Sequence, residues 1–144
     1  GIAGAELCII GAKKPGAHDP RYPDGVRDLG FVDDLGAFLG TCRALIAPIC
    51  TGGGVRVKLL DTIRIGLPAV ATTAAIGSLG PMFGLRPLDD DALFIAECRR
   101  LLTDVPAAVE LGNQLYEINR QRWQDRLPHQ AVADLLRGTA RRHV

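Results

Sequence analysis

One stretch of this 144-residue chain, residues 48–80, constrains its fold most strongly. A short apolar run at 44–47 predicts a buried strand, which leads into three consecutive glycines at 52–54. A helical pattern follows and ends at the Gly-Leu-Pro of 66–68, because glycine favours a helix C-terminus and proline cannot continue a helix. A second apolar run at 69–71 predicts the partner strand. This order places the N–H groups of a helix N-terminus beside a loop without Cβ atoms, where an anion can bind.

The rest of the chain predicts strands that alternate with helices. Three further apolar runs predict strands: 6–10 (continuous and buried), 26–29, and 85–88 (a short edge strand). Four helices are expected: one capped by Asp33 or Asp34 and ending at Gly40, and three over about 92–102, 106–123 and 129–141. Strands separated by helices predict an α/β fold with one parallel sheet. Ligands of such sheets bind at the carboxyl ends of the strands, where four segments would gather: Gly11, Gly30, 48–54 and 72–77.

Composition excludes several classes of function. The 47% hydrophobic content and the length predict one domain with a sizeable core. The formal net charge of +1 argues against nucleic-acid binding. The four cysteines form no Cys-x-x-Cys pair and the three histidines lie far apart, so a zinc site is not expected. Free cysteines, together with the lack of a signal peptide or a spanning apolar run in the sequence, favour a cytoplasmic protein.

Arginines accumulate towards the end of the chain, at Arg120, Arg122, Arg126, Arg137, Arg141 and Arg142. Such residues most often form a solvated helix face. They could also contact the anionic inner surface of a membrane, so a peripheral membrane contact stays open. The sequence does not indicate an oligomeric state.

The helix after the glycines carries two charged residues three positions apart, Lys58 and Asp61, which therefore share a face. Lys58 could approach a phosphate and Asp61 could accept hydrogen bonds from ribose hydroxyls. The alternative is a surface ion pair worth about 0.3 kcal/mol. Two named phosphate-binding loops are excluded, because Val57 stands where the nucleotidase loop and the Gly-x-Gly-x-x-Gly fingerprint each require glycine.

An acidic triplet at 89–91 contains the Asp-x-Asp pattern that holds a divalent metal in some sugar transferases. It directly precedes an amphipathic helical pattern, where acids cap the helix and interact favourably with its dipole. Capping is the preferred interpretation, and no metal is expected.

Five pieces of the chain, taken in order, carry a family resemblance. They are Leu-Cys-Ile-Ile-Gly at 7–11, Leu-Gly-Phe-Val-Asp-Asp-Leu at 29–35, the glycine loop and helix at 47–61, Gly-Leu-Pro-Ala-Val-Ala-Thr at 66–72, and the acidic residues before a helix that ends in Leu-Leu-Thr-Asp. Together they resemble the C-terminal, donor-binding half of the group 1 retaining glycosyltransferases of the GT-B fold, in the subgroup with a glycine-rich loop. The likeness spans roughly residues 6–122.

The resemblance implies a Rossmann-like parallel sheet flanked by helices and a hexosyltransferase activity. The whole enzyme would move a sugar from a nucleotide-diphosphate sugar, such as a UDP or GDP sugar, to an acceptor. The donor would be a substrate, and no cofactor is expected. The implied donor-binding residues are Gly11, Gly52, Gly53, Gly54, Val55, Arg56, Lys58, Asp61, Thr72 and Thr73. Backbone amides of Gly53, Gly54 and Val55 would hold the diphosphate, and Asp61 would hold the ribose. Gly53 stands where the family often has a sugar-binding glutamate.

The resemblance also implies that the chain lacks the family's first strand and helix and its N-terminal acceptor-binding domain. No catalytic residue is therefore expected in this chain, and the isolated chain is expected not to transfer sugar. Two alternatives remain: a sugar-nucleotide epimerase of the same architecture, and a non-catalytic α/β binding module. A receiver-like module is disfavoured, because Gly11 and Pro48 stand where it needs acidic residues.

Overall fold

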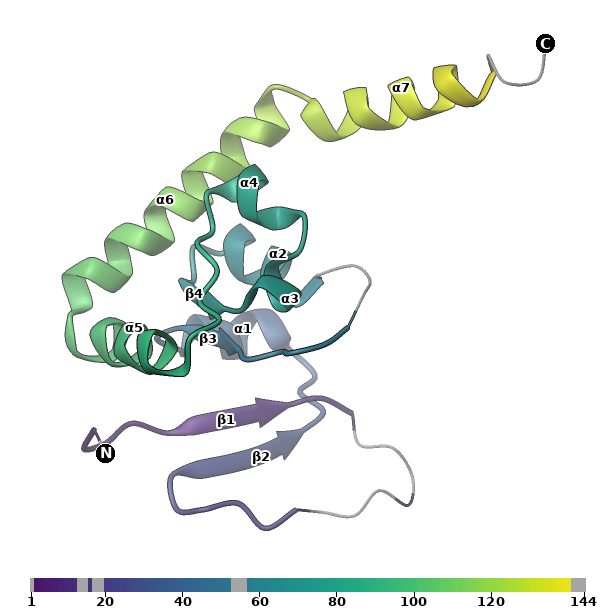
Figure 1. Ribbon diagram of the computed structural model, residues 1–144. Helices are drawn as coiled ribbons and strands as arrows, with labels where there is room; N and C mark the ends of the chain where they lie inside the picture. Colours follow the sequence, from purple (N-terminus) through teal and green to yellow (C-terminus); the bar gives the residue numbers. More distant parts are fainter. Residues whose placement is uncertain (1, 13–15, 17–19, 53–56, 141–144) are drawn as a thin grey trace.

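The computed structural model describes residues 2–12, 16, 20–52 and 57–140, of which 138–140 are described by their backbone alone. Within these residues the chain is an α/β protein (Figure 1). The strands are β1 (Leu7–Ile10), β2 (Val26–Gly30), β3 (Leu45–Ala47) and β4 (Ala69–Ala71). The helices are α1 (Leu35–Gly40), α2 (Val57–Arg64), α3 (Thr73–Ile76), α4 (Leu79–Phe83), α5 (Asp91–Thr103), α6 (Val105–Gln124) and α7 (Leu127–Ala140). The four expected helices correspond to α1, α5, α6 and α7, and the helix expected after the glycines corresponds to α2.

The strands form two parallel pairs rather than the single parallel sheet that the sequence predicts. β1 pairs with β2, with an irregularity between Ile9 and Ile10, and β3 pairs with β4 in regular register. Figure 1 shows the β1–β2 pair apart from the helices that pack on β3 and β4. Among the described residues, neither buried cluster takes a member from β1 or β2. The strand predicted at 6–10 is therefore confirmed as β1, but its predicted burial is wrong: Leu7 is 39% exposed and the other residues of β1 are half-buried.

β4 lies between two hydrophobic clusters because successive side chains of a strand point to opposite faces. Val70 joins a cluster with Leu101 of α5 and Ala108 of α6. Ala71, the next residue, joins a larger cluster that includes Ile63 of α2. Burial on both faces is typical of parallel strands, so β3 and β4 behave as the core strands of an α/β fold.

The segment 85–88 is not the edge strand that its sequence predicts. Leu85 is buried in the larger cluster, and the Leu88 N–H donates to the Ala71 carbonyl at the end of β4 (3.0 Å). Pro87 between them has no N–H to donate, so the described contacts do not extend into a ladder. The segment instead leads the chain from α4 to the start of α5.

The turn between α2 and β4 approaches α6 closely. Gly66 has a φ of +72°, which confirms it as the left-handed residue that ends α2. Its carbonyl lies against Gly112 of α6, where a Cβ would come within 2.0 Å of the Gly66 oxygen. Only glycine at 112 allows α6 to lie this close to the turn. The contact between Gly66 and Gly112 therefore determines where α6 crosses the core.

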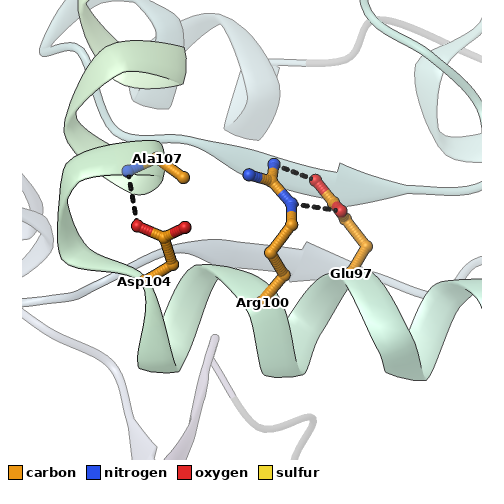
Figure 2. Close-up of polar contacts among 4 residues, drawn as sticks. All are labelled: Glu97, Arg100, Asp104 and Ala107. Carbon is orange, nitrogen blue, oxygen red and sulfur yellow. Dashed lines mark hydrogen bonds and ion pairs between the residues drawn. The ribbon is translucent and has the colours of Figure 1, made fainter.

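Aspartates begin three of the helices. Asp34 accepts from the Ala37 N–H (2.9 Å) at the start of α1, which confirms one of the two predicted caps. Asp104 accepts from the Ala107 N–H (3.0 Å) at the start of α6, as Figure 2 shows. In the same view Arg100 donates two hydrogen bonds to Glu97 (2.8 and 2.6 Å), and these hold the pKa of the Glu97 carboxyl below its usual value.

Asp90 is the N-cap of α5 and accepts from the Leu93 N–H (2.9 Å), so the capping interpretation of the acidic triplet is confirmed. We expect Asp90→Ala to lower the free energy of unfolding by about 1 kcal/mol, because one helix N–H loses its acceptor. Asp90→Asn should retain most of the stability. Asp91→Ala, at the next position, removes only a charge near the helix dipole and should cost about 0.3 kcal/mol. Urea denaturation checks this order, and equal effects of the two alanine variants would contradict it.

Three of the C-terminal arginines have contacts inside the protein. Arg120 and Arg137 each pair with an acid three residues earlier, and the Arg122 guanidinium lies 5.7 Å from the centre of the Phe83 ring. Residues 141–142 lie outside the described residues. These contacts favour a solvated helix face, and membrane contact stays a prediction. No described helix has the length and apolar character that crossing a membrane requires.

Candidate functional site

The carboxyl ends of β3 and β4 bring two loops together. The Thr72 N–H donates to the carbonyl of Ala47, the last residue of β3 (3.4 Å). The Thr72 hydroxyl donates to the Ile49 carbonyl two residues further along (2.5 Å). The segment 48–52, which leads from β3 towards α2, is thereby tied to the segment that follows β4. This confirms the expected meeting of these two loops at one edge of the sheet.

Thr72 and Thr73, which we call the threonine turn, make hydrogen bonds within the protein. Thr72 is the N-cap of α3 and accepts from the Ala75 N–H (3.3 Å). Thr73 donates both its N–H (2.8 Å) and its hydroxyl (2.6 Å) to the Asp89 carboxylate. The hydroxyl bond, followed by the N–H bond, holds the pKa of the Asp89 carboxyl below its usual value. The turn is thus held on one side by Ile49 and on the other by Asp89.

The role of Asp89 was not foreseen from the sequence, which assigns the whole triplet to capping. Asp90 caps α5 while Asp89 bonds to Thr73, which lies 16 residues earlier in the chain. One signal in the sequence could have suggested this role. Two adjacent threonines directly follow an apolar run, and the acidic triplet has more carboxylates than one helix cap needs.

A hollow of about 440 Å³ adjoins the threonine turn. Its lining is mostly apolar or glycine: Thr73, Ile76, Gly77, Gly80, Pro81, Gly84, Leu85 and Pro87. The one hydroxyl in this lining, that of Thr73, already donates to Asp89. The hollow therefore offers few polar groups to a sugar, whose recognition requires several.

Helix α2 buries one face and leaves another open. Leu59 and Ile63 are buried, whereas Lys58 is exposed and Asp61 is half-exposed. In the described part of the chain no ion pair joins Lys58 to Asp61, so the surface ion pair considered as an alternative is not observed. Both side chains stay accessible for a ligand.

The glycine loop is described only at its beginning. Gly52 is exposed and has a φ of +140°. The other loop residues predicted to bind the donor, Gly53, Gly54, Val55 and Arg56, lie outside the described residues.

Gly11 is placed differently from the other predicted site residues. Its N–H donates to the Gly30 carbonyl (2.8 Å), so these two glycines meet at the end of the β1–β2 pair. Ladder hydrogen bonds do not join this pair to β3–β4 within the described residues. Hydrogen bonds thus join the four loops in two pairs, Gly11 with Gly30 and segment 48–52 with Thr72.

No group of three or more potential metal ligands occurs in the part of the chain that the structure describes. One member of the Asp-x-Asp pattern, Asp89, already accepts two hydrogen bonds from Thr73. The expectation that no metal is needed stays a prediction.

Two paired parallel strands with a helix between them in the chain, and segments 48–52 and 72–73 joined at their carboxyl edge, are typical of a mixed α/β protein of Rossmann-like type. The family model described as "Glycosyl transferases group 1" matches residues 2–104. The chain belongs to this family, which confirms the resemblance at that level. No curated protein and no solved structure gives a significant match.

Proposed function

We propose that this chain binds the nucleotide-diphosphate sugar donor of a group 1 glycosyltransferase, with the diphosphate at the N-terminus of α2. The observation that carries the proposal is the β3–α2–β4 unit, in which the Thr72 hydroxyl bonds to Ile49 and ties together the two loops at the carboxyl edge. Ligands of parallel α/β sheets bind at this edge. The match to the group 1 family over residues 2–104 supports a role in sugar transfer.

Charge complementarity supports the position of the diphosphate. The N-terminus of α2 carries a partial positive charge from the helix dipole and from N–H groups without intrahelical partners. Lys58, in the first turn of α2, adds an exposed ammonium group. These groups, with the amides of Gly53, Gly54 and Val55 and the side chain of Arg56, would stabilise the negative charge that develops on the departing diphosphate.

Asp61 is the proposed ribose ligand. It lies three residues after Lys58 and is half-exposed, so both side chains project from the same open region of α2. A carboxylate accepts hydrogen bonds and does not donate them, which suits vicinal hydroxyls. Sugar transfer to an acceptor is proposed for the whole enzyme, and donor binding for this chain.

A thermal-shift panel with UDP, GDP and ADP and their sugars tests the proposal. A nucleotide present at a hundred times its dissociation constant should add about 2.7 kcal/mol of stability. We expect Lys58→Ala to weaken the binding about tenfold, because one charge-assisted contact to the diphosphate is lost. Arg64→Ala, at the other end of α2, is the matched control, because Arg64 is also exposed and basic but lies in the last turn.

The two variants separate a diphosphate site from a general effect of charge. If Lys58→Ala and Arg64→Ala weaken binding equally, the nucleotide is attracted by net charge rather than held at the start of α2. If the unmodified chain shows no shift with any of the nucleotides, the proposed function is contradicted.

A further inference from the structure

The Thr72 hydroxyl joins three segments of the chain. A hydroxyl has one donor and two acceptor sites. Thr72 donates to the Ile49 carbonyl, 23 residues earlier, and accepts from the Ala75 N–H of α3. Its own N–H donates to Ala47 at the end of β3. The hydroxyl and the N–H of Thr72 are thus both bonded to other groups of the protein.

The segment held by Thr72 has little packing of its own. All residues from 48 to 52 are exposed, and the largest apolar side chain among them, Ile49, is 42% exposed. Thr72, in contrast, follows Val70 and Ala71, which are 1% exposed and lie in the two hydrophobic clusters. A hydrogen bond from a residue anchored in the core to an exposed segment orders that segment more than it stabilises the core.

Asp89 holds the threonine turn from the opposite side. Its carboxylate accepts from the Thr73 N–H and from the Thr73 hydroxyl, and the next residue, Asp90, caps α5. The turn is therefore tied to the start of a helix of 13 residues. Because Thr72 and Thr73 are adjacent, this second attachment restrains the orientation of the Thr72 hydroxyl towards Ile49.

We propose that Thr72 is a positioning residue: its hydroxyl fixes segment 48–52, at the entrance to the glycine loop, and Asp89 holds the turn that carries it. This inference rests on the proposed function. It differs from a donor contact through the Thr72 hydroxyl, because that hydroxyl is already engaged by Ile49 and Ala75. Fixing the segment before the ligand arrives reduces the entropy lost on binding, so the hydroxyl contributes to affinity without touching the nucleotide.

The test compares Thr72→Val, which keeps the shape of the side chain and removes the hydroxyl, with Thr72→Ser, which keeps the hydroxyl. Thr103→Val is the matched control, because the Thr103 hydroxyl also donates to a backbone carbonyl (that of Arg99, 2.9 Å) but lies in α5. Two quantities are measured on the whole chain: the backbone NMR order parameters of residues 49–52, which report how well the segment is fixed, and the affinities for UDP, GDP and ADP.

We expect Thr72→Val to lower the order parameters of 49–52 and to weaken nucleotide binding about fivefold, the loss typical of one neutral hydrogen bond. Thr72→Ser and Thr103→Val should match the unmodified chain in both measurements. Asp89→Ala should also lower the order parameters of the threonine turn and of 49–52, with a smaller loss of affinity.

Three outcomes would overturn the proposal. Unchanged order parameters with weaker binding in Thr72→Val would mean that the hydroxyl contacts the nucleotide directly. Lower order parameters with unchanged binding would mean that the ordered segment does not serve the ligand. A serine variant that behaves like the valine variant would exclude the hydroxyl as the cause. Failure of the unmodified chain to bind any of the three nucleotides contradicts the proposed function instead, and the order parameters then decide alone whether Thr72 orders the segment.

Discussion

Replacing Gly112 with alanine is expected to lower the free energy of unfolding by about 2 kcal/mol, although alanine is the better helix former. The new Cβ would lie 2.0 Å from the Gly66 carbonyl oxygen and 3.4 Å from the Pro68 ring. The first atom belongs to the backbone and the second to a ring fixed at the start of β4, so neither can turn away. Helix α6 must therefore shift from the turn between α2 and β4. This strain exceeds the gain of about 1 kcal/mol that alanine brings to a helix interior.

Gly40→Ala is the matched control for this substitution. Gly40 also lies in a helix, α1, and a Cβ there would meet nothing within 4 Å. This variant should be neutral or slightly more stable. Urea denaturation of both variants gives the comparison. A Gly112→Ala variant as stable as the unmodified chain would show that α6 can move away from Gly66 at little cost.

The second large effect is expected for Leu101→Ala, which should lower the free energy of unfolding by about 3 kcal/mol. Leu101 is 0% exposed and lies in the cluster with Val70 of β4 and Ala108 of α6. Its removal leaves a cavity at the point where α5, α6 and the core strand meet.

Leu102→Ala is the control, because Leu102 is the next residue of α5 and is 38% exposed. It should cost less than about 1 kcal/mol, since much of its side chain is already in water. Differential scanning calorimetry and urea denaturation measure both variants. Equal losses for Leu101→Ala and Leu102→Ala would contradict the packing of α5 described above.

Helices α1, α2, α5, α6 and α7 could be predicted from sequence because local chemistry determines their ends, whereas the short helices α3 and α4 were not predicted. Asp34 and Asp90 each precede an apolar helical pattern, and each accepts from an N–H in the first turn. Gly66 and Pro68 end α2, as their backbone preferences require. The same local logic did not reveal the contact between Gly66 and Gly112, because no sequence pattern indicates which helix crosses above the turn.

The strands were predicted less well than the helices. The apolar run at 6–10 has the composition of a core strand, yet β1 lies outside both clusters and leaves Leu7 exposed. The run at 85–88 forms no strand. One described backbone hydrogen bond, from the Leu88 N–H to the Ala71 carbonyl, joins it to β4, and a single bond does not make a ladder. Strand burial depends on which elements pack on each face, and this information is distributed over the whole chain.

The candidate site shows the same division. Lys58 and Asp61 were expected on a common open region of α2, and the structure leaves both accessible. Thr72 and Thr73 were expected to contact the donor, whereas the described bonds of their hydroxyls go to Ile49, Ala75 and Asp89. These partners are up to 23 residues away, so only the folded chain could reveal that the turn is braced.

The sequence by itself determined the β3–α2–β4 unit, because glycine spacing, caps and apolar runs act over a few residues. It also determined the membership in the group 1 family, whose model matches residues 2–104. Only the tertiary structure decided that the strands form two parallel pairs and that Gly112 lies against Gly66. It also decided that Asp89 holds Thr73. The physical reason is that hydrogen bonds and steric contacts between distant residues depend on how whole elements pack, and packing is a property of the complete fold.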